Sequence, residues 1–180
     1  ADMLGNLFVL VRYGGAIYLL WLAWRLWRAA GDPTQVAALT DAQVQALTTA
    51  QIARLDTADL QGLSTADVAL LSAAQIGALT VAQISSLSTA QVNAIDAGDL
   101  AGLSTAAIKV MSAAQIAALS ETQLAALSTA QVAAIDAVDL RGLSSAQLSA
   151  FDLQQVAALS SAQVAVLTPA QIAALDDTQI

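Results

Sequence analysis

An eight-residue repeat fills most of the chain and limits what the chain can fold into. From Asp32 onward the sequence divides every eight residues without insertion, and residues 32–175 hold eighteen full repeats followed by a partial one. We call each repeat an octad and number its positions 1 to 8, starting at Asp32. An uninterrupted array of this kind predicts a repeat architecture in which each unit packs against its neighbours.

The octad pattern is typical of a helix start. Position 1 is Ser, Thr or Asp in every copy, and position 4 is Gln or Asp except at Ala107. Position 5 is Val, Ile or Leu, and position 8 is Leu or Ile except at Met111 and Phe151. Ser or Thr followed three residues later by Gln resembles a capping box, in which two side chains bind free amides of the first helical turn. Pro33 and Pro169 both occupy position 2, the first helical position, where proline is best tolerated.

These patterns predict an all-α solenoid, a superhelix of very short capped helices. One continuous helix does not fit, because eight residues turn through about 800° and the apolar stripe would rotate by about 80° per octad. Helices this short are stable only when packed, so positions 5 and 8 should lie inside, with Ser, Thr and Gln outside. A β-solenoid is the alternative, although Ala and Gln favour strands poorly and positions 5 and 8 would face opposite sides of a strand.

A longer period runs through the same array. The segments 56–63, 96–103 and 136–143 share the pattern D-x-x-D-L-x-G-L and recur at every fifth octad. The simplest geometry that stacks these copies has about five octads per superhelical turn. Duplication of a five-octad unit would leave the same period without that geometry. Glycine in each copy indicates a close backbone approach or a sharper corner.

The amino-acid composition gives little support for catalysis or for ligand binding. The chain has no histidine and no cysteine, and no general base accompanies its many Ser and Thr residues, so we expect no enzyme, no catalytic residue and no cofactor. Its net charge of −8 makes nucleic acid a poor partner. The only candidate site is a set of three acid pairs, which are weak Ca²⁺ candidates if they stack: Asp56 with Asp59, Asp96 with Asp99, and Asp136 with Asp139. Two carboxylates per pair are few for an ion that takes six to eight oxygen ligands, so we interpret these acids as helix caps.

Residues 1–31 form a separate hydrophobic segment in front of the array, which occupies residues 32–180. Residues 4–24 are almost wholly apolar, and about twenty apolar residues suffice for a membrane-spanning helix. Arg12 within this stretch is costly in a bilayer, so the alternative is a helix that caps the array. The run GGAIYLLWLAWRLWRA at residues 14–29 resembles a transmembrane helix of the LysE-type amino-acid exporters. This resemblance implies membrane insertion and not transport.

The octads themselves resemble the octapeptide-repeat segments of large secreted bacterial surface proteins, adhesin-like proteins that carry L-[ST]-T-A-Q-[VI]-A-A-L runs. The resemblance covers residues 32–180 and implies a non-catalytic structural or adhesive protein, such as a surface stalk, a spacer or a segment of a self-assembling filament, placed outside the cell or on its surface. The alternative is a membrane-anchored interaction module, tethered by the N-terminal hydrophobic helix.

The last octads should also make contacts. No polar cap closes the array after Leu167, Ile172, Leu175 and Ile180. Repeat proteins normally need such caps to stay soluble. We therefore expect self-association, another protein or further sequence to cover this C-terminal end.

Overall fold

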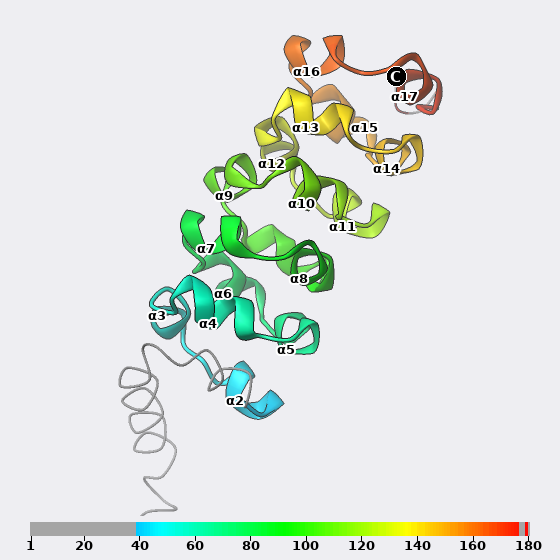
Figure 1. The fold of residues 1–180 in the computed structure, drawn as a ribbon. Coiled ribbons are helices and arrows are strands. Elements are labelled where there is room, and N and C mark those ends of the chain that lie inside the picture. The colour runs from blue at the N-terminus through cyan, green and yellow to red at the C-terminus, as the bar shows by residue number, and fades with distance from the viewer. Residues whose placement is uncertain (1–38, 177–178, 180) are drawn as a thin grey trace, which may run out of the picture.

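The computed structural model describes residues 39–176 and residue 179. Within these residues the chain forms sixteen α-helices of four to six residues and one 3-10 helix, with no strand. The array climbs as a superhelix from α2 at one end to α17 at the other (Figure 1). The predicted all-α solenoid is confirmed, and the β-solenoid alternative is wrong. The predicted hydrophobic helix within residues 1–31 lies outside the described residues.

The helices recur at the spacing of the octad. Every α-helix begins at position 2 of its octad and ends before or at position 7. The elements are α2 (Asp41–Gln45), α3 (Thr49–Ile52), α4 (Thr57–Gly62), α5 (Thr65–Ala69), α6 (Ala73–Gly77), α7 (Val81–Ser86), α8 (Thr89–Ala94), η2 (Asp99–Gly102), α9 (Thr105–Val110), α10 (Ala113–Ala117), α11 (Glu121–Ala125), α12 (Thr129–Ala134), α13 (Ala137–Arg141), α14 (Ser145–Ser149), α15 (Leu153–Ala157), α16 (Ser161–Ala165) and α17 (Pro169–Ala173).

The helices begin where the capping pattern predicts. Position 1 is the N-cap of every described α-helix and has extended backbone angles, as at Ser88 with φ −69° and ψ 158°. Thirteen of the sixteen α-helices have a complete capping box. The exceptions are α4, α9 and α13, where position 4 is Asp59, Ala107 and Asp139. Pro169 occupies the first position of α17, where its missing N–H leaves no hydrogen bond unmade.

Positions 5 and 8 form one core that runs through the array. Ile76, Leu100, Leu124 and Leu148, all at position 5, have no exposed surface. The position-8 side chains join them in a single continuous cluster. Burial of this stripe supplies the stability that helices of five residues lack on their own.

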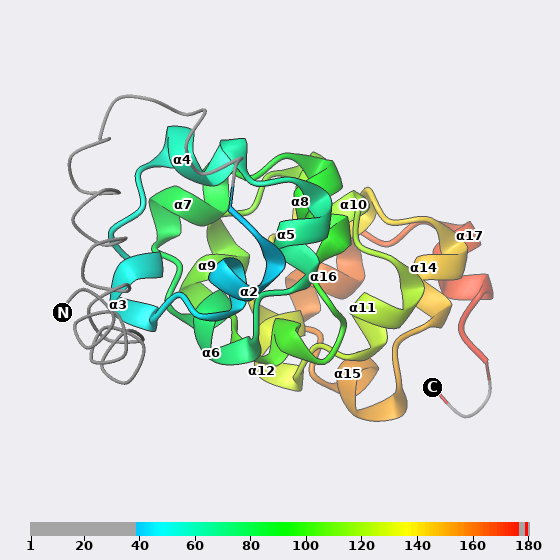
Figure 2. The ribbon, with the colours of Figure 1, turned by 90° about the horizontal axis from the view of Figure 1, so that it is seen from below.

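The superhelical turn is shorter than the five-octad period. Helices in contact begin three octads apart: α4 packs against α7, α5 against α8 and α10 against α13. In Figure 2, α4 lies beside α7 and α5 beside α8. The predicted five octads per turn is therefore wrong, since a turn takes three to four. Successive turns meet through the core side chains at positions 5 and 8 and through cross-turn contacts between helices three octads apart.

One octad departs from the common form. In residues 96–103 the Oδ1 of Asp96 accepts a hydrogen bond from the backbone N of Gly98 at 2.9 Å, and the octad forms the 3-10 helix η2. Its Gly102 meets α6 backbone to backbone, because a Cβ there would lie 2.0 Å from the carbonyl oxygen of Ala73. A Cβ at Gly77 would lie 2.7 Å from the carbonyl oxygen of Gly102. The close approach predicted for the repeated glycine is confirmed at this copy.

Candidate interaction surface

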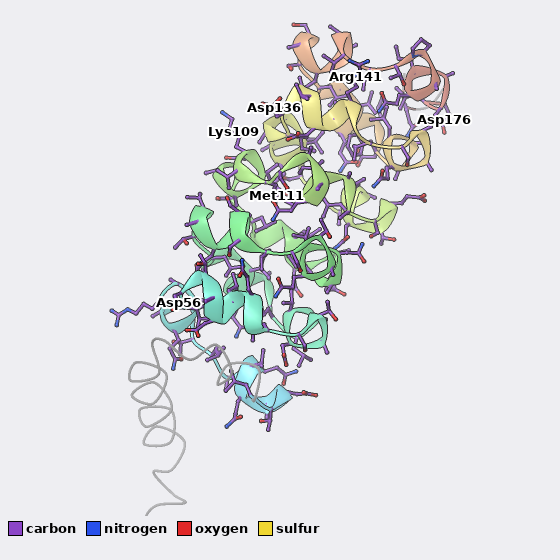
Figure 3. The ribbon with its side chains drawn as sticks, in the orientation of Figure 1. Asp56, Lys109, Met111, Asp136, Arg141 and Asp176 are labelled. Atoms are coloured by element: carbon purple, nitrogen blue, oxygen red, sulfur yellow. The ribbon has the colours of Figure 1, made fainter. Side chains whose placement is uncertain are left out.

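The three acid pairs do not come together. Asp56 and Asp136, labelled in Figure 3, lie far apart along the array, because ten octads separate them and a turn takes three to four octads. The Oδ1 of Asp56 accepts a hydrogen bond from the backbone N of Asp59 at 2.7 Å, so Asp56 caps α4. Among the described residues, no group of three acids is placed to hold a metal ion.

In two of the three pairs, the second acid has a raised pKa. Partial burial raises the pKa of Asp59 and of Asp139 above the ordinary value of 3.8, and the neighbouring charges of Asp56 and Asp136 raise each pKa further. Both carboxyls occupy position 4, the slot that most octads fill with glutamine. The slot therefore suits a neutral amide better than a carboxylate.

Ten of the described position-4 glutamines are buried inside the solenoid, where we had expected them outside. Gln115 is only 3% exposed. Its Oε1 accepts hydrogen bonds from the backbone N and the hydroxyl of Ser112, at 2.8 and 3.1 Å. Its Nε2 donates to the carbonyl oxygens of Ile84 and Leu87, both at 2.9 Å. One side chain therefore starts its own helix and also satisfies the final carbonyls of a helix in the preceding turn.

This cross-turn arrangement runs the length of the array. In each case the Nε2 reaches carbonyl oxygens 28 to 31 residues earlier, at Gln75, Gln83, Gln91, Gln115, Gln123, Gln131, Gln147, Gln155, Gln163, Gln171 and Gln179. A primary amide has both an acceptor oxygen and two N–H donors, so it can make all of these bonds at once. Every buried side-chain nitrogen or oxygen of the described residues has a hydrogen-bond partner.

A signal in the sequence pointed to this role and was missed. A capping box accepts a carboxylate as well as an amide, yet position 4 is Gln in fourteen of the nineteen copies and Asp in four. Only the amide can donate to the carbonyls of the preceding turn. The preference for the amide over the carboxylate agrees with a donor function beyond the cap.

At the C-terminal end of the array, apolar side chains are exposed at an octad position that is buried in the interior of the array. Val164 and Ile172 occupy position 5, yet they are 47% and 46% exposed, whereas Ile116 at the same position is fully buried. Leu153 beside them is 48% exposed. Of the side chains expected at this end, Leu167 is buried and Leu175 half-buried, and Ile180 lies outside the described residues.

A shallow cavity of about 290 Å³ opens on this end. We call the surface around it the end face; it is lined by Leu153, Val156, Ala157, Leu159, Val164, Leu167, Ile172, Leu175 and Gln179. Its lining residues belong to α15, α16 and α17 and the segments that follow them, the helices at the C-terminal end of the array in Figure 1. Among the described residues, the lining side chains are apolar except for the amide of Gln179.

None of the described helices is both long enough and apolar enough to cross a bilayer.

Comparison with known proteins identifies the array. The family model described as the ALTTAQ repeat matches the chain three times, at residues 52–89, 92–129 and 132–169. Successive matches begin five octads apart, so each covers one copy of the longer period. No curated protein matches the chain, and no solved structure matches it. Because the three matches together cover more than half of its residues, the chain belongs to the ALTTAQ repeat family.

Proposed function

We propose that this chain is a non-catalytic structural protein whose octad array acts as a rigid spacer. The observation that carries the proposal is the series of cross-turn glutamine bonds. Each turn is joined to the turn before it by buried amides, such as Gln123 to Ile95 at 2.7 Å and Gln131 to Leu103 at 2.8 Å. Buried, fully bonded polar groups hold neighbouring elements in one register.

The distribution of side chains supports the same proposal. The array repeats one packing unit along its length, and the chemistry of an enzyme requires distinct groups converging on one place. The octad that forms the 3-10 helix makes the tight contact at Gly102, which removes space instead of creating a cavity. A spacer has to resist bending and hold a distance. A continuous core with cross-turn bonds would meet both needs.

Distance measurement by electron spin resonance tests this proposal directly. The chain has no cysteine, so spin labels can be placed without background at Thr65→Cys and Ser161→Cys, two exposed helix starts far apart along the array. A rigid spacer gives one narrow distance distribution. The control pair, Thr65→Cys with Thr89→Cys, reports two helices that pack against each other. A broad distribution for the long pair beside a narrow one for the control would contradict the proposal.

We place this spacer on a bacterial cell surface or outside the cell, where it would serve as a stalk, an adhesive segment or part of a filament. The support is the resemblance of the octads to those of large secreted surface proteins. The test is fractionation of the producing cell, followed by protease treatment of intact cells. Degradation of the array without lysis is expected, and full protection would contradict this placement.

A membrane-anchored interaction module is the second candidate. It rests on the apolar run at residues 4–24 and its likeness to an exporter helix. Flotation of the full chain with phospholipid vesicles tests it against a variant lacking residues 1–31. Vesicle binding that disappears in the shortened variant would support an anchor. Binding that persists, or that never occurs, would contradict one.

A further inference from the structure

The cross-turn glutamine bonds are interrupted at two neighbouring octads in the interior of the array. Position 4 is Asp99 in residues 96–103 and Ala107 in residues 104–111. A carboxylate and a methyl group cannot donate the hydrogen bonds that a glutamine amide donates elsewhere. These two octads therefore lack the side-chain donor that joins other octads to the preceding turn.

The backbone groups that such donors would serve are left without partners. They lie four octads earlier, within residues 64–79. The carbonyl oxygens of Leu71 and Leu79, at position 8, accept no hydrogen bond among the described residues, although the two residues are only 1% and 7% exposed. The same carbonyl one octad later, at Leu87, accepts the Nε2 of Gln115 at 2.9 Å. A buried carbonyl without a donor destabilises the closed arrangement of these turns.

Apolar contact holds most of this junction together. Gly102 lies backbone to backbone against Ala73. No hydrogen bond among the described residues joins residues 96–103 to the preceding turn. The octad that follows has one such bond at its surface, from the Oγ of Ser85 to the carbonyl oxygen of Val110 at 3.3 Å.

We propose that residues 96–111 form a seam, a place where the turns of the array part before they part elsewhere in its interior. Opening the seam lets water reach the carbonyls of Leu71 and Leu79, which have no partner while it is closed. Opening at Gln115 instead breaks hydrogen bonds that are already made. Both effects favour opening at the seam. This device goes beyond the spacer function, which requires only that the seam be closed most of the time.

The same omission recurs at the longer period of the sequence. Asp59 and Asp67 occupy position 4 of two neighbouring octads that precede the seam, and Asp139 occupies it five octads after Asp99. Four octads before Asp139, the carbonyl oxygen of the buried Met111 also accepts no hydrogen bond among the described residues. The five-octad period, which does not match the superhelical turn, thus marks octads that lack a cross-turn donor.

Native-state hydrogen exchange of the full chain, measured by nuclear magnetic resonance, tests the seam. The reporters are position-5 amides, which donate to the position-1 carbonyl of their own octad. We expect the amides of Leu100 and Ile108 to open at least about tenfold more often than those of Val92 and Ile116, in the octads on either side. Fraying from a chain end changes protection steadily along the array, so it cannot produce a minimum here. Protection at Leu100 and Ile108 equal to that of their neighbours would overturn the proposal.

Variants at position 4 should remove the seam or create one. Ala107→Gln supplies an amide for the carbonyl of Leu79 and should slow the opening of Ile108 at least about tenfold. The matched control is Ala107→Glu, which can complete the cap of α9 but has no N–H donor. Gln123→Ala copies the natural omission into a regular octad, so it should raise the opening of Leu124 by a similar factor. Equal effects of Gln and Glu at position 107, or unchanged exchange in Gln123→Ala, would show that the missing donors do not make a seam.

Discussion

Replacing the buried Gln115 with alanine should lower the free energy of unfolding by more than the loss of a capping box alone would. The substitution removes the acceptor of the Ser112 backbone N–H and the glutamine donor of the Leu87 carbonyl. The Ile84 carbonyl keeps its bond from the backbone N of Leu87, at 3.2 Å. The buried Leu87 carbonyl thus loses its donor at about 1–3 kcal/mol. The lost cap at the exposed Ser112 adds about 1 kcal/mol, so we expect a loss of about 2–4 kcal/mol in the free energy of unfolding.

Gln51 provides the matched control for this substitution. Its Oε1 accepts from the backbone N and the hydroxyl of Thr48, both at 2.8 Å, and among the described residues it makes no cross-turn bond. Gln51→Ala should therefore cost about 1 kcal/mol, as the loss of a capping interaction does. The difference between Gln115→Ala and Gln51→Ala isolates the contribution of the cross-turn donors.

Urea unfolding followed by circular dichroism measures both variants. Hydrogen exchange on the native chain then locates the weakened turn, because repeat arrays do not always unfold in one step. Gln115→Glu sharpens the test, since glutamate preserves the cap but places a carboxylate against two carbonyl oxygens. Equal costs for Gln115→Ala and Gln51→Ala, or a harmless Gln115→Glu, would refute the structural role assigned to the amide.

Four further outcomes are expected. Leu119 is 1% exposed, so Leu119→Ala should lower the free energy of unfolding in urea by about 2–5 kcal/mol. A loss no larger than that caused by an alanine substitution at an exposed position would contradict the assignment of Leu119 to the core. Gly102→Ala should cost at least about 2 kcal/mol because its Cβ would lie 2.0 Å from a backbone oxygen of Ala73, whereas Gly98→Ala, whose Cβ would meet only a side-chain oxygen at 3.3 Å, should cost less. The raised pKa of Asp139 means that its favourable contribution to stability is complete below the ordinary pKa of 3.8 and is lost as the pH rises through the folded-state value. Asp139→Gln should therefore stabilise the array at neutral pH and do so less in acid. An equal gain at both pH values, measured by urea unfolding, would contradict the raised pKa. Finally, adding Ca²⁺ should leave the melting temperature unchanged, and a large rise that disappears when one acid pair is replaced would show that the pairs bind the ion.

The helix starts and the core could be predicted because they depend on local rules. A cap at position 1 is a property of a few neighbouring residues, and the stripe at positions 5 and 8 follows from helical geometry. The superhelical turn could not be predicted in the same way, because it depends on how a helix seats on another that begins three octads away. The five-octad period of Gly62, Gly102 and Gly142 suggested a turn. The packing of helices three octads apart does not follow this period.

Of the two roles of the position-4 glutamine, only the capping role was predicted, for a related reason. The capping role of glutamine lies within one octad and is visible in the spacing. Its donor role joins octads almost one turn apart, so it appears only when the turn is known. The end face was predicted from the apolar residues at Ile172 and Leu175.

The fixed reach of the glutamine bonds has a consequence for how the array forms. Each bond joins residues 28 to 31 apart, and this separation stays the same however many octads the chain contains. A longer array therefore closes no longer loops, and the search for native contacts does not slow as repeats are added. The direction of the bonds matters as well, because each amide reaches back to carbonyls that precede it in the chain. During synthesis, every new octad finds its acceptors already made, so the array can grow in order from its N-terminal side, with each completed turn templating the next.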